Sequence, residues 1–202
     1  MKNAIYTGPP IDDHCTFELM PAELQARLSK MNGCVAFKGG LHMRGVCKKL
    51  LWHSIENVWR GEYALFKLFS TVLPTDIPFA QDCLGDQFLL RDSVVYRLSA
   101  ETGEVQSMEV DLDGFFTRVE EDPVGFLMLS PLILFLQQGG KMEPGQSLSV
   151  YPPFCCVESS QGISVKAIDT LQLLMAHAQL AQAISKHQPG DKLNIYEIMM
   201  GD

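Results

Sequence analysis

The sequence predicts an α+β fold in a single domain, with a central antiparallel sheet flanked by helices. Short runs of β-branched and aromatic residues alternate with polar turns between residues 77 and 110. On both sides of this stretch, apolar residues recur at helical spacing. No shift in composition divides the 202 residues, so we expect one domain over residues 1–202. It should consist of a lead-in arm over 1–19, a core over 20–130 and a helical C-terminal extension over 131–202.

The core is expected to open with a helix that begins at Pro21, because proline suits the first helical position. Leu24, Leu28 and Met31 follow at spacings of four and three residues, which places them on one apolar stripe. Gly33 ends the helix, since glycine tolerates the left-handed conformation at a helix C-terminus. A short strand is expected over residues 41–44.

The middle of the chain predicts a β-meander. Aspartate and glycine fill the intervals between its apolar runs, and both residue types favour turns. Such short turns join antiparallel neighbours. The strands are expected at residues 77–81, 87–91, 94–98 and 105–110.

A helix should follow the meander, with Asp111 or Asp113 as its N-terminal cap. Phe115, Phe116 and Val119 would form its buried face.

The C-terminal part predicts two further helices and one strand. Ser130 begins the first helix, and because residues 132–136 leave that helix no polar face, we expect it to be buried. Residues 141–153 are rich in proline and are expected to form a loop. A strand is expected over 162–168, followed by a long helix from about 169 to 186 that ends before Pro189-Gly190.

Acidic residues concentrate in the stretch from Asp76 to Asp122. This stretch holds twelve Asp and Glu residues and three Arg, while the whole chain has a net charge of −8. A negative field attracts cations and basic surfaces and repels phosphates. We therefore expect no nucleic-acid partner.

The carboxylates around the meander turns are the candidate binding residues, and three interpretations stay open. In the first interpretation, the turns themselves require aspartates. Paired carboxylates could perform general acid–base chemistry if one were buried. The third interpretation is a docking surface for a basic protein, whose partner-binding residues would be Asp82, Asp86, Asp92, Glu101 and Glu104.

Two groups of residues have the chemistry of metal ligands. Alternation along an extended strand would place Glu109, Asp111 and Asp113 on one face, where they could hold a hard cation, although helix capping is the favoured interpretation. His42 and His53, with Cys47 between them, suit zinc, but their spacing matches no zinc motif. We therefore expect neither a metal nor a cofactor.

The six cysteines are expected to be reduced thiols, because no pair has the spacing of a zinc knuckle or a redox motif. Cys155 and Cys156 are adjacent, and adjacent residues rarely allow disulfide geometry. Phosphate-loop and nucleophile-elbow signatures are absent from the sequence, so the residues alone indicate no reaction.

The sequence also predicts a cytoplasmic location without a membrane partner. Its N-terminus lacks the apolar segment of a secretory signal. The most apolar stretch, residues 126–136, is interrupted by Pro131 and is shorter than the roughly 20 residues that span a bilayer.

A set of hydrophobic and turn motifs over residues 20–130 resembles a known group, the SUKH superfamily. That superfamily takes in the yeast cell-wall-assembly regulator and many bacterial toxin-immunity proteins. The motifs are Pro21, Leu24, Leu28 and Asn32-Gly33, then Gly39-Gly40-Leu41, then Ile77-Pro78-Phe79-Ala80-Gln81-Asp82 and Gly85-Asp86-Gln87-Phe88.

The resemblance implies an α+β fold and a non-enzymatic protein that works by binding other proteins. Many bacterial members are thought to neutralise a cognate toxin, which agrees with an acidic surface that covers a basic effector. The leading hypothesis is therefore an immunity protein. The alternative is a housekeeping scaffold or regulator with an apolar interface around Trp52 and Trp59.

Overall fold

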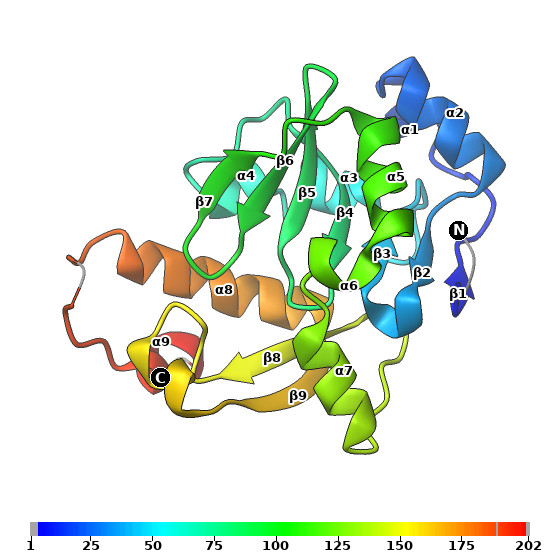
Figure 1. Ribbon diagram of the computed structural model, residues 1–202. Helices are drawn as coiled ribbons and strands as arrows, with labels where there is room; N and C mark the ends of the chain where they lie inside the picture. The colour runs from blue at the N-terminus through cyan, green and yellow to red at the C-terminus, as the bar shows by residue number, and fades with distance from the viewer. Residues whose placement is uncertain (1–3, 189, 201–202) are drawn as a thin grey trace.

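The computed structural model describes residues 4–188 and 190–200 and confirms the predicted fold class. Seven strands form one sheet in which each strand pairs antiparallel with the next one in the sequence. Helices lie on both faces of this sheet (Figure 1). The strands are β1 (Tyr6–Thr7), β2 (Cys34–Ala36), β3 (Leu41–Met43), β4 (Ile77–Asp82), β5 (Gln87–Arg91), β6 (Val94–Ser99) and β7 (Glu104–Ser107).

Tight turns set the register of the predicted meander, which is confirmed as β4 to β7. Asp92 and Ser93 connect β5 to β6 with φ values of 47° and 63°, as a two-residue hairpin turn with positive φ at both positions requires. Arg91 therefore pairs with Val94. The next turn closes at Gly103, which has a φ of 74°.

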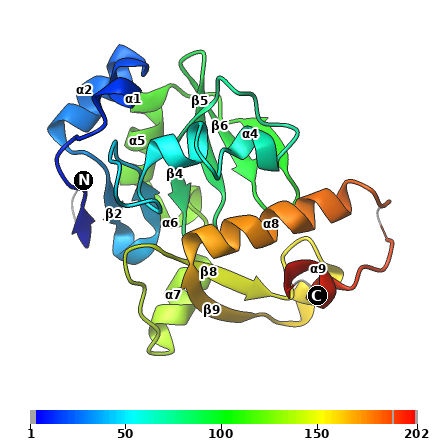
Figure 2. The ribbon, with the colours of Figure 1, turned by 180° about the vertical axis from the view of Figure 1, so that it is seen from behind.

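Both faces of the sheet are buried. Helix α5 (Leu112–Glu121) covers one face, and α3 (Ile55–Trp59), α4 (Leu65–Leu68) and α8 (Thr170–Ile184) lie behind the sheet in Figure 1 and in front of it in Figure 2. Successive side chains of a strand point to opposite faces. In β5, Phe88 packs against Phe115 of α5, whereas Leu89 belongs to a second cluster of buried residues that includes Leu174 of α8.

The N-terminal segment is more ordered than the predicted arm. Tyr6 and Thr7 pair with β2 as an edge strand. Two helices follow, α1 (His14–Glu18) and the predicted α2 (Ala22–Lys30). The expectation of an arm over residues 1–19 is wrong for these residues, because two- and three-residue strands carry no periodic signal.

The C-terminal extension is not purely helical. It holds α6 (Pro123–Phe126) at its border, then α7 (Ser130–Gln137), β8 (Gln146–Tyr151), the 3₁₀ helix η2 (Val157–Gln161), β9 (Ser164–Asp169), α8 and α9 (Ile195–Met200). Strands β8 and β9 pair as a second, two-stranded antiparallel sheet.

Strand β8 lies where the sequence predicted a loop. Prolines flank this strand, and we therefore read the whole segment as a loop. Within it, apolar and polar residues alternate, which places Leu148 and Val150 in the interior. The long helix is confirmed over residues 170–184, and Met175 on its outer side is 37 % exposed. Pro189 lies outside the described residues.

A buried polar network joins the two sheets. Arg44 is 1 % exposed and donates to the side-chain oxygens of Gln81 at 2.5 Å and Gln87 at 2.6 Å. Gln81 in turn donates to the hydroxyls of Ser147 at 3.0 Å and Thr170 at 2.5 Å. The network satisfies the terminal nitrogens of Arg44 and both buried hydroxyls, which would otherwise carry a desolvation penalty, whereas Arg44 Nε has no hydrogen-bond partner among the described residues.

In residues 4–188 and 190–200, none of the helices combines the length and the apolar character that crossing a membrane requires.

Candidate functional site

Two of the five candidate carboxylates are used inside the fold. Asp82 has no exposed side-chain surface, and its carboxylate lies 3.0 Å from the Arg97 guanidinium. Asp86 shares the same guanidinium at 2.8 Å. Burial, followed by the charge of Asp86, raises the pKa of Asp82 to about 8, although Arg97 opposes this shift.

Backbone donors explain why aspartates occupy this turn. Asp82 accepts hydrogen bonds from the backbone N–H groups of Leu84 at 2.9 Å and Asp86 at 3.1 Å. Asp86 accepts one from Ala100 at 2.9 Å. Asp82 and Asp86 thus hold the β4–β5 turn against the end of β6. Asp82 meets the burial condition that acid–base chemistry would require, but its side chain has no exposed surface in this structure.

Glu101 is also engaged within the molecule. Its carboxylate accepts hydrogen bonds from the backbone N–H of Phe154 at 3.1 Å and of Cys155 at 2.9 Å. It thereby ties the loop after β8 to the β6–β7 turn.

Asp92 and Glu104 are exposed, but they lie at opposite ends of the meander. Asp92 lies in the turn before β6, whereas Glu104 pairs with Ser99, which is the last residue of β6. The expectation that the five carboxylates share one docking surface is therefore wrong. Successive turns of a meander lie at opposite ends of its strands, so the β5–β6 turn that carries Asp92 is remote from the other four residues. Arg97 also engages two of the five carboxylates, Asp82 and Asp86.

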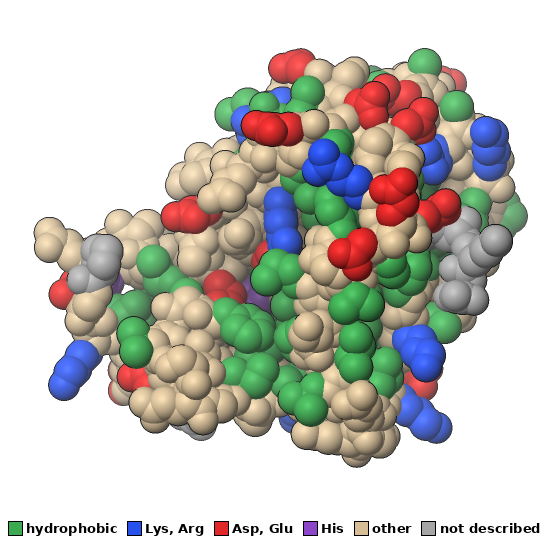
Figure 3. All heavy atoms as spheres, in the orientation of Figure 1, with side chains coloured by type: hydrophobic (Ala, Val, Ile, Leu, Met, Phe, Trp, Pro, Cys, Tyr) green, Lys and Arg blue, Asp and Glu red, His purple; other side chains and the backbone are tan. Residues whose placement is uncertain are grey.

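Exposed carboxylates gather instead on and beside α5. Figure 3 shows acidic side chains clustered over this helix. Among the exposed residues of segment 109–122, Arg118 is the single base. The exposed acidic residues are Glu109, Asp111, Asp113, Glu120, Glu121 and Asp122.

The N-terminal carboxylates of this group have structural partners. Asp111 caps α5 by accepting from the backbone N–H of Gly114 at 2.7 Å. Asp113 lies 2.6 Å from Arg27 of α2. The capping interpretation is therefore confirmed for Asp111. Among the described residues, no ion-pair partner is found for Glu120 or Glu121 at the other end of the helix.

An exposed apolar strip continues from the acidic end of α5. On and after α6, Val124 is 44 % and Met128 is 54 % exposed. On α7, Ile133 is 37 % and Leu134 is 42 % exposed, while Leu132 is buried. The expectation that α7 is buried is wrong. This helix lies at the outside of the molecule, so only the side that packs against other elements is buried.

We call this combined region the α5–α7 surface. It consists of the exposed side chains of Glu120, Glu121, Val124, Met128, Ile133 and Leu134. Contiguous exposed apolar side chains rimmed by polar residues are typical of protein-interaction sites. No sequence motif indicates this site, although the absence of a polar face on α7 is the signal that could have located it.

The histidines considered as zinc ligands belong to an aromatic cluster. His42 Nε2 lies 2.9 Å from His53 Nδ1, and His53 Nε2 lies 3.1 Å from the carbonyl oxygen of Asn32. Burial lowers the pKa of both imidazoles, that of His53 to about 4. In the part of the chain that the structure describes, no group of three His, Cys, Asp or Glu side chains is arranged to hold a metal ion.

The two tryptophans do not form an exposed apolar interface. Trp59 is 4 % exposed and donates its indole N–H to the carbonyl oxygen of Pro74 at 3.2 Å. Trp52 is half-buried and packs against Tyr6, His42 and His53.

No family model matches this chain, and no curated protein sequence matches it.

Proposed function

We propose that this chain is a non-enzymatic protein-binding module that recognises a basic partner through the α5–α7 surface. The observation that carries the proposal is the juxtaposition of exposed apolar side chains with carboxylates that have no ion-pair partner among the described residues. Apolar contacts of this kind contribute affinity, and the flanking charges contribute association rate and selectivity.

The SUKH-like motifs give the proposal a specific form, an immunity protein that neutralises a toxin. A toxin that acts on nucleic acid presents basic groups to phosphates. A carboxylate rim beside an apolar strip offers such a toxin both charge complementarity and burial of apolar area. A cytoplasmic location is part of this proposal.

The first experiment tests binding and protection together. The chain is co-expressed with the polypeptide encoded by the adjacent gene, and growth is measured; the purified pair is then studied by calorimetry at several salt concentrations. We expect the chain to restore growth and to bind with an affinity that decreases as salt increases. An adjacent polypeptide that leaves growth unaffected, or that forms no complex, contradicts the immunity proposal.

Two charge-reversal variants locate the binding surface. Glu120→Lys with Glu121→Lys is expected to weaken binding at least about tenfold, chiefly through slower association. The matched control is Asp92→Lys with Glu104→Lys, which makes the same change in net charge at exposed positions outside the α5–α7 surface. Equal loss of affinity in both variants would show that net charge, and not this surface, determines binding.

The second candidate function is a scaffold or regulator with an apolar interface. The exposed Ile133 and Leu134 favour it, although at a different place from the tryptophans first considered. In that case, Ile133→Ser with Leu134→Ser should abolish binding, whereas Glu120→Lys with Glu121→Lys should leave both the affinity and its salt dependence unchanged.

A further inference from the structure

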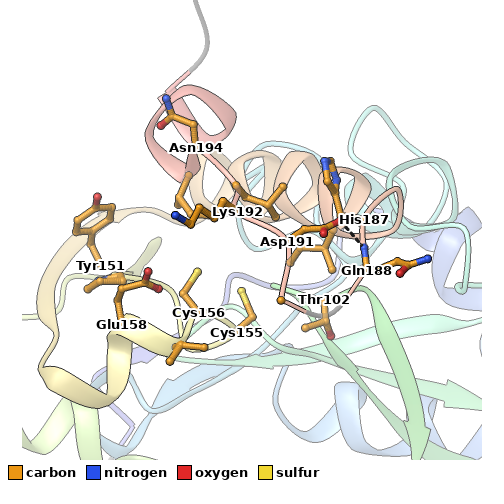
Figure 4. A pocket seen from close by; sticks show the side chains of 16 residues that line it. Thr102, Tyr151, Cys155, Cys156, Glu158, His187, Gln188, Asp191, Lys192 and Asn194 are labelled. Atoms are coloured by element: carbon orange, nitrogen blue, oxygen red, sulfur yellow. Dashed lines mark hydrogen bonds between the residues drawn. The ribbon is translucent and has the colours of Figure 1, made fainter.

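A pocket of about 910 Å³ lies between the loop after β8 and the segment that leads to α9. Figure 4 shows Cys155 and Cys156 side by side on one wall, with both sulfur atoms directed into the space. Lys192 and Asp191 come from the segment across the pocket. This site is separate from the α5–α7 surface and independent of the proposed function.

The turn that carries the two thiols is held from the large sheet. Glu101 of the β6–β7 turn accepts hydrogen bonds from the backbone N–H groups of Phe154 and Cys155. The pKa of the Cys155 thiol is raised by burial, by the Glu101 carboxylate and by Cys156. Both cysteines are free thiols, and Cys155 is exposed. The pair is therefore presented to the pocket before any ligand arrives.

We propose that Cys155 and Cys156 form a dithiol site for a trivalent, thiophilic metalloid of the arsenite class. Each thiol condenses with one hydroxyl group of the metalloid. Two sulfur–arsenic bonds form, two arsenic–oxygen bonds break, and the two thiol protons leave in two molecules of water. Arsenic remains trivalent, so the step requires no oxidant or reductant.

The adjacency of the two thiols favours a ligand that binds both of them over reactions that need only one thiol, such as alkylation. After the first sulfur–arsenic bond forms, the second forms within the molecule, at the high effective concentration that proximity provides. Burial and neighbouring acidic groups raise the pKa of both thiols. Fewer thiolates are then available for alkylation or disulfide exchange, which proceed through the thiolate.

The remaining cysteines provide internal controls. Cys34, Cys47 and Cys83 are buried, whereas Cys15 is exposed and is not adjacent to a second cysteine in the sequence. A reagent that needs two thiols should thus discriminate between Cys15 and the Cys155–Cys156 pair.

The probe is phenylarsine oxide, which loses one water molecule when it bridges two thiols. The protein is treated with the probe and challenged with excess glutathione, and its intact mass is measured. We expect one retained adduct that dithiothreitol releases. Cys155→Ser and Cys156→Ser should each reduce retention by about a hundredfold, while Cys15→Ser should retain the adduct. Circular dichroism verifies that each variant is folded.

A second measurement uses the unmodified chain, so that it does not depend on the folding of a variant. When the untreated and the probe-treated chains are labelled with maleimide after unfolding in urea, which exposes every thiol equally, the probe should protect Cys155 and Cys156 together, as seen by peptide mapping, and should leave Cys15 reactive. Retention that persists in either single-serine variant, protection of only one of the two thiols, or no retained adduct on the unmodified chain would overturn the proposal.

Discussion

A carboxylate without exposed surface needs donors close by, and Asp82 shows how a turn supplies them. Two backbone N–H groups and the Arg97 guanidinium surround it. Removing one partner of a buried ion pair lowers the stability of the fold by more than the intact pair contributes to it. The reason is that the other charge stays buried without a partner. Asp82 is therefore a structural residue, although its acidity alone suggested a binding role.

His177 is the residue whose titration should be most visible in stability. It is 4 % exposed, its Nδ1 has no hydrogen-bond partner among the described residues, and burial lowers its pKa to about 4. The unfolded chain, with a pKa near 6.5, binds a proton more readily between these two values. The contribution of His177 to stability is therefore complete above pH 6.5 and is lost as the pH falls toward 4.

We predict that His177→Leu flattens the decrease in unfolding free energy between pH 7 and pH 4 by about 3 kcal/mol. Urea titrations at several pH values measure how the unfolding free energy depends on pH. His42 and His53 act in the same direction, and Asp86 opposes the shift at His177, so the informative quantity is the difference between variant and wild type.

At the scale of elements, the N-terminus of α5 shows which of two aspartates is the helix cap. The sequence offered both Asp111 and Asp113 for this role, and the structure assigns it to Asp111. We predict that Asp111→Ala lowers the unfolding free energy by about 1 kcal/mol, because the helix loses its N-terminal cap. Asp113→Ala should cost about 0.5 kcal/mol or less, since it removes an ion pair whose aspartate side chain is 90 % exposed. Thermal denaturation of both variants compares the two costs, and equal costs would contradict the assignment of the cap.

Helix α7 shows the limit of amphipathicity as an indicator of burial. Its apolar residues surround the axis, yet only one of them is fully buried. Periodicity reports which side of a helix is polar, but it cannot report whether a second layer is present to cover the other side. The position of α7 at the edge of the fold leaves part of it uncovered, and this produces the α5–α7 surface.

At the scale of the whole molecule, Arg44 and Gln81 connect the two sheets through side chains rather than strand pairing. We predict that Gln81→Met lowers the unfolding free energy by about 3 kcal/mol, because it removes an acceptor from a buried guanidinium and donors from two hydroxyls. Calorimetry measures the change.

Ser147→Ala is the matched control for this network. It removes a neutral hydroxyl and should cost only about 1 kcal/mol. If Gln81→Met were no more destabilising than Ser147→Ala, the network would not contribute to holding β8 and α8 on the large sheet.

The local features of this protein could be predicted from its sequence. Alternating strands between aspartate and glycine turns defined the meander, and apolar spacing defined α2, α5 and α8. These signals lie within a few residues of one another, so they depend on local conformation alone. The α+β class followed from their order along the chain.

Only the tertiary structure decided which charges reach solvent. Arg97 contacts both Asp82 and Asp86, and Glu101 binds a loop more than fifty positions later in the sequence. Strands β1, β2 and β8 likewise exist because partners from elsewhere supply their hydrogen bonds. Pairing, burial and charge neutralisation join residues distant in sequence, so the acidic, apolar surface on α5 to α7 became visible only in three dimensions.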